Sequence, residues 1–378
     1  MYVKRQLDIK KVLEKKSCFL FGPRQTGKTS LIQNTLQEFR YYNLLKTDIY
    51  LRLNRAPQRL REEITENDKI VIIDEIQKLP ILLDEVHYLI EEKDIHFLLT
   101  GSSARKLRSK GVNLLGGRAR TRHMRPFIYK ELNNDFRLLR ALDTGLIPSI
   151  YFSDAPYEDL EAYTGNYLKE EIAAEAMVRN VPAFSRFLTV AGLCNGKMIN
   201  YTNIGRDAEV PKSTVQEYFQ ILRDTLLGDD LPAWKKSLKR KAVSTSKFYF
   251  FDIGVARFLQ NRQGLKMQSP EFGEAFEAYI HHELKAYCDY RGGVDLCYWR
   301  SISGFEVDFI LNGKTAIEVK GKANITSNDY KGLRSLKEEA ILNNYLLVSL
   351  EDTPRKIGDI RILPWKDFLM NLWQDKYV

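Results

Sequence analysis

Eight consecutive residues near the start of the chain have the spacing of a phosphate-binding loop: Gly22, Pro23, Arg24, Gln25, Thr26, Gly27, Lys28 and Thr29. In the pattern G-x-x-x-x-G-K-T, backbone N–H groups wrap the phosphates, the lysine reaches the outer phosphate oxygens, and the threonine hydroxyl binds Mg²⁺. The apolar run Ser17 to Phe21 precedes the loop, and a helical pattern that begins near Ser30 follows it, as this motif requires. The sequence therefore predicts an ATP site formed by Gly22 to Ser30, with Mg²⁺ as its metal.

Two acidic residues, Asp74 and Glu75, end the apolar strand that is expected at Ile70 to Ile73. Acids in this position ordinarily begin a loop or cap a helix, but beside a phosphate-binding loop they suit hydrolysis. Asp74 would hold Mg²⁺ through water, and Glu75 would orient and deprotonate the attacking water. A further strand, Ile95 to Thr100, ends beside Ser102 and Ser103, so a hydroxyl there can sense the terminal phosphate; the choice among the three is open, and Thr100 is included in the nucleotide site.

A stretch without acidic residues runs from Ile95 to Lys130 and contains nine basic ones. Most of these are expected to be solvated surface. Phosphoryl transfer, however, is accelerated by an arginine that is often supplied by a neighbouring subunit. Arg105 and Arg118 are the candidates, and action in trans would require a homo-oligomer, of which a hexameric ring is one form.

A second set of charged residues lies near the C-terminus in the form D-x9-E-x-K: Asp308, Glu318 and Lys320. Two carboxylates can bind a divalent metal, Mg²⁺ or Mn²⁺, that polarises a phosphodiester and activates water, and the lysine can stabilise the developing charge. This resembles the PD-(D/E)xK nuclease signature, and Glu277 on the preceding helix matches the additional acid of that fold. The alternative is that polar residues simply alternate along a half-exposed sheet.

The expected hairpin between Phe305 and Lys320 permits a test of this site. A two-residue turn at Asn312-Gly313 would put Asp308 and Glu318 on opposite faces of the sheet. Keeping the apolar faces of both strands together requires one extra residue, which pairs Asp308 with Glu318. The sequence therefore predicts a three-residue turn with Gly313 in a left-handed conformation.

The order of patterns along the chain divides it into four segments of an α/β multi-domain protein. Residues 1–132 alternate strands and helices, as in a parallel sheet with crossover helices; residues 133–186 are helical, as in a lid or connector; residues 187–247 have the outline of a winged helix-turn-helix; and residues 248–378 form a separate α/β domain. The third helix and the basic run after it are the candidate DNA contacts, with packing as the alternative for the helix. These residues are Lys212, Ser213, Thr214, Gln216, Lys235, Lys236, Lys239, Arg240 and Lys241.

Composition adds few constraints. The 378 residues carry a net charge of +9, which permits a polyanionic partner such as DNA. The four cysteines lie far apart, which argues against a zinc site or a disulfide framework. The N-terminus lacks an apolar signal core, and no apolar run reaches the length of a membrane span, so we expect a cytoplasmic protein that uses no membrane.

Several spaced motifs occur in one order: Gly22 to Thr29, Asp74 to Pro80, Leu99 to Ser103, Gly117-Arg118, Ser246 to Gly254, Phe276-Glu277 and Glu318 to Lys320. Together they resemble the AAA+-type ATPases of bacteria and archaea that carry a C-terminal winged helix and restriction-endonuclease-like domain. The resemblance implies an AAA+-like ATPase core, a helical lid, a winged helix and a nuclease-like domain. The expected function is a Mg-ATP hydrolase that binds DNA and couples nucleotide state to a metal-dependent nuclease, which could act on branched or otherwise structured DNA. The alternatives are a regulatory ATPase with an inactive nuclease fold and a protein remodeller.

Overall fold

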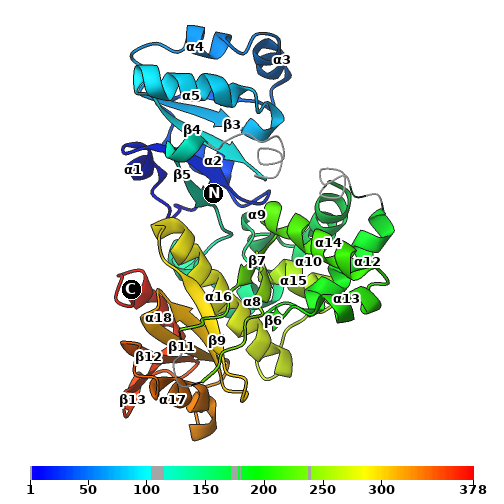
Figure 1. Ribbon diagram of the computed structural model, residues 1–378, viewed down its shortest axis with the longest axis vertical. Helices are drawn as coiled ribbons and strands as arrows, with labels where there is room; N and C mark the ends of the chain where they lie inside the picture. The colour runs from blue at the N-terminus through cyan, green and yellow to red at the C-terminus, as the bar shows by residue number, and fades with distance from the viewer. Residues whose placement is uncertain (1, 104–114, 172–177, 179, 237–239) are drawn as a thin grey trace. The chain divides into compact units, whose positions relative to one another are not determined.

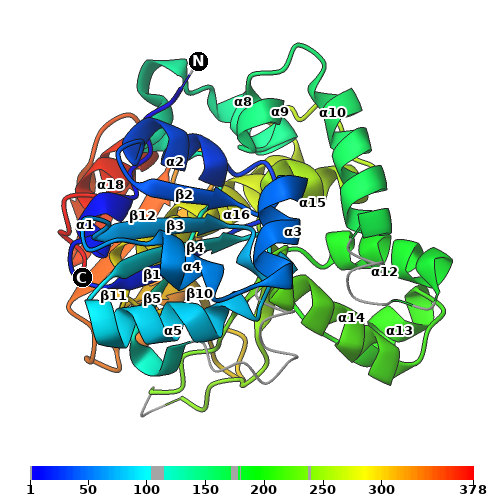
Figure 2. The same ribbon diagram turned by 90° about the horizontal axis from the view of Figure 1, so that it is seen from above.

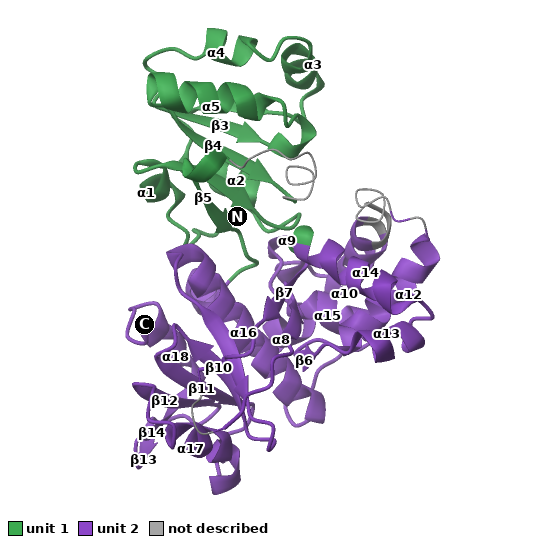
Figure 3. Ribbon diagram, viewed as in Figure 1, with its two compact units in different colours: residues 1–127, 224–226 green, residues 128–223, 227–378 purple. Residues whose placement is uncertain are grey.

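The computed structural model describes residues 2–103, 115–171, 178, 180–236 and 240–378 (Figure 1). The chain forms two compact units, coloured separately in Figure 3. Unit 1 comprises residues 1–127 and 224–226, and unit 2 comprises residues 128–223 and 227–378. Among the described residues, no helix is both long and apolar enough to cross a membrane.

Unit 1 is built on a parallel five-stranded sheet, as the alternating pattern predicts. The strands lie in the order β2 (Arg40–Asn43), β3 (Ile70–Asp74), β4 (His96–Gly101), β1 (Ser17–Phe21) and β5 (Ala119–His123). Because β4 lies between β1 and β3, the carboxyl ends of these three strands meet at one edge of the sheet. The phosphate-binding loop follows β1, the acidic pair closes β3, and Thr100 lies near the end of β4.

Helices cover both faces of this sheet. Alternate side chains such as Phe19, Ile73 and Leu99 pack in one apolar core with α5 and its neighbours, while the intervening residues, such as Leu20, are buried on the other face. Figure 2 shows α2 and α5 on opposite sides of the strands. Burial on both faces explains why the strands read as continuous apolar runs. The helices are α1 (Ile9–Leu13), α2 (Lys28–Thr35), α3 (Thr47–Arg55), α4 (Arg59–Glu63) and α5 (Leu82–Lys93).

The basic stretch after β4 is not solvated loop throughout. Its described part includes an edge strand, β5, that pairs with β1 from Ser17 opposite Ala119 to Phe21 opposite His123. Exposed or half-exposed charged residues along it, such as Arg120, suit a sheet edge that must not pair further. Because basic residues occupy much of this strand, alternation of apolar and polar residues in the sequence does not identify it.

Unit 2 begins with a helical region that shares one apolar core from Ile147 to Leu259. A small antiparallel sheet belongs to it, in the order β6 (Lys197–Met198), β8 (Lys247–Phe250), β7 (Gly228–Leu231). The segments at 133–186 and 187–247, which the sequence pattern separated, therefore pack together in one core. Strand β8 and helix α15 belong to the same core, although the sequence pattern put nearly all of both in the C-terminal domain. The helices are α7 (Tyr129–Leu132), α8 (Leu138–Thr144), α9 (Pro148–Tyr151), α10 (Pro156–Ala162), α12 (Val181–Leu193), α13 (Tyr201–Asp207), α14 (Lys212–Asp224) and α15 (Ile253–Leu259).

The rest of unit 2 is a mixed six-stranded sheet in the order β13-β14-β12-β11-β10-β9. Helix α17 packs in the core on one face, against residues such as Val307 and Ile310. The strands are β9 (Leu296–Arg300), β10 (Glu306–Leu311), β11 (Thr315–Lys320), β12 (Asn344–Ser349), β13 (Arg355–Ile357) and β14 (Ile360–Pro364); the helices are α16 (Pro270–Arg291), α17 (Lys331–Lys337) and α18 (Trp365–Leu372).

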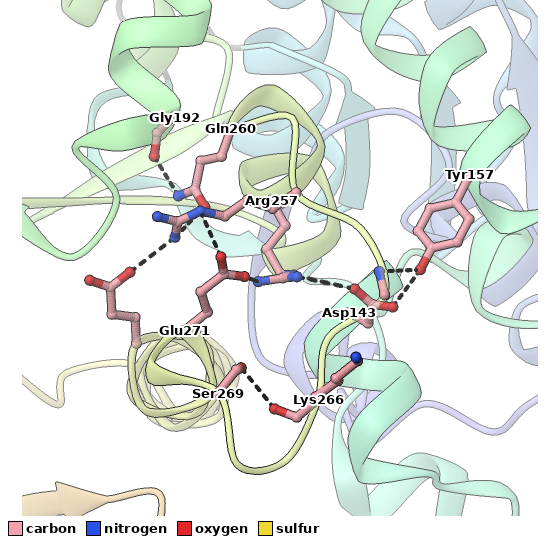
Figure 4. Close-up of polar contacts among 11 residues, drawn as sticks. Asp143, Tyr157, Gly192, Arg257, Gln260, Lys266, Ser269 and Glu271 are labelled. Carbon is pink, nitrogen blue, oxygen red and sulfur yellow. Dashed lines mark hydrogen bonds and ion pairs between the residues drawn. The ribbon is translucent and has the colours of Figure 1, made fainter.

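A buried arginine joins the helical region to the C-terminal sheet domain (Figure 4). Arg257 of α15 is 3% exposed and pairs with Asp143 of α8 at 3.3 Å and with Glu271 of α16 at 3.2 Å. The hydroxyl of Tyr157, from α10, donates a hydrogen bond to the same Asp143 carboxylate. One guanidinium thus connects three helices and satisfies two carboxylates.

Replacing Arg257 by alanine should lower the free energy of unfolding of unit 2 by about 3–5 kcal/mol, because it leaves the largely buried Asp143 without its cation. Tryptophan fluorescence during urea unfolding measures this directly, since all four tryptophans lie in unit 2. Arg206→Ala is the matched control, because the Arg206 pair with Asp207 is exposed and should contribute little. Equal urea midpoints for the two variants would contradict the prediction.

Candidate functional site

The loop between β1 and α2 has the backbone shape of a phosphate cradle. Gln25 and Gly27 have positive φ angles of 63° and 96°, and Gly27 caps α2. A Cβ on Gly22 would lie 2.5 Å from the carbonyl oxygen of Met124, so glycine is required there. The N-terminus of an eight-residue helix follows the loop directly, which favours an anion at this position.

Lys28, the first residue of α2, is buried with 6% of its surface exposed. Its ammonium donates hydrogen bonds to the carbonyl oxygens of Gly22 at 2.6 Å and Pro23 at 3.0 Å. Burial lowers the pKa of Lys28 to about 8, although the carboxylates of Glu75 and Asp74 act in the opposite direction. Lysine and the two acids therefore belong to one electrostatic cluster, as the two motifs predict.

The acidic pair at the end of β3 is held from several sides. Asp74 is 2% exposed and accepts hydrogen bonds from the hydroxyls of Tyr41, at 2.7 Å, and Thr100. Glu75 has a left-handed backbone with φ 62°, and its carboxylate accepts a hydrogen bond from the side-chain amide of Gln77. Burial raises the pKa of Glu75, which suits a general base that must take a proton from water. Of the three candidate hydroxyls, Thr100 is the one that contacts Asp74.

Arg5 is a supporting residue that the motifs do not reveal. Its guanidinium donates hydrogen bonds to the carbonyl oxygens of Thr26 in the loop at 2.7 Å and of Arg125 at 2.6 Å, and it lies over the Phe127 ring. It therefore fixes the back of the phosphate-binding loop to the segment that ends unit 1. No spacing signal links residue 5 to residue 125, so only the fold could find it.

Arg118, one of the two arginine candidates, is not part of this cluster. Arg118 precedes Ala119, which pairs with the first residue of β1, so Arg118 lies at the edge of the sheet opposite the loop. It forms an ion pair with Glu91 of α5. Arg118 therefore does not reach the phosphate-binding loop of its own chain, and its role stays a prediction for a site in another subunit. Arg105 lies outside the described residues.

The lowered pKa of Lys28 gives ATP binding a pH dependence. Below pH 8 the lysine is already charged, but above its pKa of about 8 it is neutral and must take up a proton to meet the phosphates. The dissociation constant for ATP should therefore increase from pH 8 to 9.5, with proton uptake measurable by calorimetry in buffers of different ionisation enthalpy. AMP, which lacks the outer phosphates, is the control. A constant ATP affinity across this range would contradict the prediction.

The C-terminal charged cluster is built on the β10–β11 hairpin. Leu311 pairs with Thr315 and Phe309 with Ile317, which leaves a three-residue turn, and Gly313 has φ 62°. The predicted turn and the left-handed glycine are thus confirmed. Continued by one position, this register puts Asp308 opposite Glu318, and an Asp308 oxygen accepts a hydrogen bond from the Val319 N–H at 2.8 Å.

Both carboxylates of the hairpin are buried, each with 7% exposed. Burial, with Glu277 adding to it, raises the pKa of Asp308 to about 6, and burial and Asp308 raise that of Glu318 further above its usual range. Lys320 donates to Oε1 of Glu318 at 2.6 Å, while the buried Oε2 has no hydrogen-bond partner among the described residues. Asp308, Glu318 and Lys320 therefore lie close together, and burial disfavours the charged form of both carboxylates.

A divalent metal fits this pair in one respect. The orphaned Oε2 of Glu318 is an acceptor that a cation would satisfy, and Mg²⁺ is commonly held by one or two carboxylates with water filling the rest. Within the described part of the chain, however, no three His, Cys, Asp or Glu side chains converge as a metal-ligand group. The third acid, Glu277, has other partners.

Glu277 lies on α16 and binds residues of β8. One carboxylate oxygen accepts hydrogen bonds from the Tyr249 hydroxyl at 2.7 Å and from the Lys247 ammonium at 3.3 Å. Lys247 also pairs with Glu306 at 2.7 Å, at the first position of β10. Lys247, Tyr249, Glu277 and Glu306 line one pocket of about 390 Å³. Lys247 belongs to the motif Ser246 to Gly254, so the sequence pointed to this segment but did not predict the contacts of Lys247 with Glu277 and Glu306.

The predicted DNA contacts divide into three groups. Lys212, Ser213 and Gln216 are exposed on the first turns of α14, with Thr214 half-buried, and Lys235, Lys236 and Lys241 are exposed as well. Arg240 has protein partners instead: its guanidinium pairs with Glu338 at 2.6 Å and donates to the Ser335 carbonyl oxygen, which connects the segment to the end of α17. Lys239 lies outside the described residues.

Three family models match consecutive parts of the chain. One described as an AAA domain matches residues 14–133. Two domains of unknown function follow, DUF8612 at residues 125–266 and DUF4143 at residues 272–368. The second match ends shortly after α15, and the helical core of unit 2 ends within α15, at Leu259. No curated protein matches the chain.

Among the solved structures that match is a Signal Transduction ATPase with Numerous Domains (STAND) protein with a tetratricopeptide repeat sensor from Pyrococcus horikoshii. The likeness has 16% identity and a TM-score of 0.23, and it covers 77% of this chain and 47% of that chain. The chain thus spans about half the length of this relative. At this TM-score the likeness carries no conclusion about fold or function.

Proposed function

We propose that this chain, a P-loop ATPase of the AAA type, hydrolyses ATP with Mg²⁺, binds DNA through unit 2 and couples nucleotide state to a metal-dependent nuclease site at Asp308 and Glu318. The observation that carries the proposal is the hairpin register, which brings Asp308, Glu318 and Lys320 together. A homo-oligomer belongs to the proposal, because Arg118 does not belong to the described cluster around its own phosphate-binding loop, and an arginine from a neighbouring subunit often accelerates phosphoryl transfer.

At the nucleotide site the residues have separate tasks. The loop N–H groups and Lys28 bind the phosphates, and the oxygens of Thr29 and Asp74 are the hard donors that Mg²⁺ prefers. Bound there, the metal would neutralise charge on the phosphates. Glu75 orients the attacking water and takes its proton, while Thr100 holds Asp74 in position.

DNA binding is supported by exposed cations and by topology. Helix α14 follows α13 after a short turn, and the antiparallel sheet β6-β8-β7 supports the proposal that this region is a winged helix. Lys212 and Gln216 are exposed on α14, and Lys235, Lys236 and Lys241 are exposed in the connection between β7 and β8. Contacts of this kind go mainly to the phosphate backbone, so affinity should fall steeply with salt and depend little on sequence.

The nuclease proposal is tested with the full chain and its Asp308→Asn variant. With Mg²⁺ or Mn²⁺, the unchanged protein should cleave at least one of duplex, single-stranded or branched DNA, and the variant should lose about 100-fold or more of that rate. ATP hydrolysis serves as the control for folding and should be retained. If the unchanged protein cleaves none of these substrates with either metal, the nuclease proposal is wrong.

A second function is favoured by the pairing of the same acids with lysines. Lys320 pairs with Glu318, and Lys247 pairs with both Glu277 and Glu306, so three of the four acids have a cation partner without a metal. The chain would then be a regulatory ATPase whose C-terminal domain only binds nucleic acid or protein. Stimulation of ATP hydrolysis by DNA without any cleavage would favour this function; stimulation by polypeptide instead would favour a protein remodeller.

A further inference from the structure

The acid cluster of unit 2 contains a cation that comes from outside the hairpin. Lys247 belongs to β8 of the small sheet, yet its ammonium lies 2.7 Å from Glu306 and 3.3 Å from Glu277, and only 6% of its side chain is exposed. Burial alone would lower the pKa of Lys247, but Glu277, Asp308 and Glu306 raise it above its ordinary value. The lysine is therefore a fixed positive charge among carboxylates.

A fixed ammonium and a divalent cation compete for the same carboxylate oxygens. Glu277 contributes to the raised pKa of both Asp308 and Glu318, so its charge is felt by the hairpin pair. The Glu277 oxygen that the Lys247 ammonium and the Tyr249 hydroxyl share is therefore engaged away from a metal. Among the described residues, accordingly, Glu277 does not join Asp308 and Glu318 in a group of three possible metal ligands.

We propose, on the basis of the nuclease function above, that Lys247 is an internal counter-cation that withholds Glu277 from Asp308 and Glu318, and that a nucleic-acid phosphate in the adjoining pocket draws Lys247 away and so completes the metal site. The pocket that Lys247 lines has a volume of about 390 Å³, and three basic side chains (Lys197, Lys247, Arg300) and three acidic ones (Glu274, Glu277, Glu306) line it. A phosphate there gives the ammonium an alternative anionic partner. DNA and metal then bind with positive coupling, which must be reciprocal.

The test measures Mn²⁺ binding to the nucleotide-free full chain by calorimetry, so it does not depend on cleavage. Lys247→Gln should bind Mn²⁺ about tenfold more tightly than the unchanged protein, the size of a typical coupling. Lys247→Arg keeps the charge and should resemble the unchanged protein. Lys356→Gln is the matched control, because Lys356 is an exposed lysine of β13 to which neither proposal gives a role.

A second measurement needs no substitution and covers the case in which Lys247→Gln fails to fold. A phosphorothioate oligonucleotide, which resists cleavage, should tighten Mn²⁺ binding to the unchanged protein by a similar factor. The oligonucleotide should not increase the Mn²⁺ affinity of Lys247→Gln any further. Equal Mn²⁺ affinities with and without the oligonucleotide, or an affinity of Lys247→Gln no tighter than that of the unchanged protein, would overturn the proposal.

Asp308→Asn separates the failure of this inference from the failure of the nuclease proposal. If Asp308→Asn abolishes Mn²⁺ binding but Lys247→Gln does not change it, the metal site stands and the role of Lys247 is wrong. If Asp308→Asn leaves Mn²⁺ binding unchanged, the hairpin holds no metal and both proposals fall.

Discussion

Replacing Glu75 by glutamine should lower kcat for ATP hydrolysis about 10²–10⁴-fold, the range that general-base catalysis contributes. Glutamine has the same shape as glutamate and can keep a contact with Gln77, so nucleotide binding should be preserved. Because burial raises the pKa of Glu75, kcat should fall on the acid side at a pH above the usual carboxylate range. That fall follows protonation of the base and should be absent from the residual activity of Glu75→Gln.

Steady-state kinetics and nucleotide titrations of the two proteins measure both effects. Glu62→Gln is a matched control, since Glu62 is exposed on α4 of the same unit and should leave kcat unchanged. A Glu75→Gln enzyme with more than about one tenth of the normal kcat would exclude general-base catalysis by this residue. A loss of ATP binding in the variant would instead show that Glu75 shapes the nucleotide site.

The parts of both sites that depend on local pattern were predictable. Strands β1 and β11 have the predicted bounds, Ser17 to Phe21 and Thr315 to Lys320, because apolar runs between turn residues specify them. The turn after Leu311 was also predictable, since a period of two residues ties burial to register and only one turn length keeps the apolar faces together. In both cases the information lies within about 20 residues of chain.

The hairpin also departs from simple alternation. Between Val307 and Ile310 the pairing of β10 with β9 shifts by a bulge, and both residues pack in the core beside α17. Strict alternation along the strand would put Val307 and Ile310 on opposite faces of the sheet. A bulge depends on the strand that pairs with it, and β9 lies outside the hairpin. The hairpin sequence alone therefore does not predict the bulge.

Contacts between remote segments were not predictable. Arg5 reaches Thr26 and Arg125, and Lys247 reaches Glu277 and Glu306, each across sequence separations that no motif spans. The same limit applies to the packing of α15, because its apolar periodicity indicates a buried helix but not which core buries it. The predicted domain limits stay predictions. The apolar core of the helical region shows only which segments pack together.

Replacing Lys28 by methionine should lower kcat/KM for ATP by at least about 100-fold and, at the same time, stabilise unit 1. The activity is lost because methionine cannot place a positive charge on the outer phosphates. The fold gains because a lysine whose pKa falls from 10.5 to about 8 on burial destabilises the folded state by roughly 3 kcal/mol at neutral pH.

The sign of this stability effect follows from the depressed pKa of a base. Folding disfavours the charged lysine, so the penalty is present in full below pH 8 and disappears as pH rises from about 8 to 10.5, where both states become neutral. Hydrogen exchange of the β1 and β3 amides at pH 7 without nucleotide should therefore slow in Lys28→Met. Lys46→Met, at an exposed lysine of the same unit, is the control. Faster exchange in Lys28→Met than in the unchanged protein would show that the hydrogen bonds from Lys28 to Gly22 and Pro23 outweigh its burial, and that the loop is held in shape by the lysine itself.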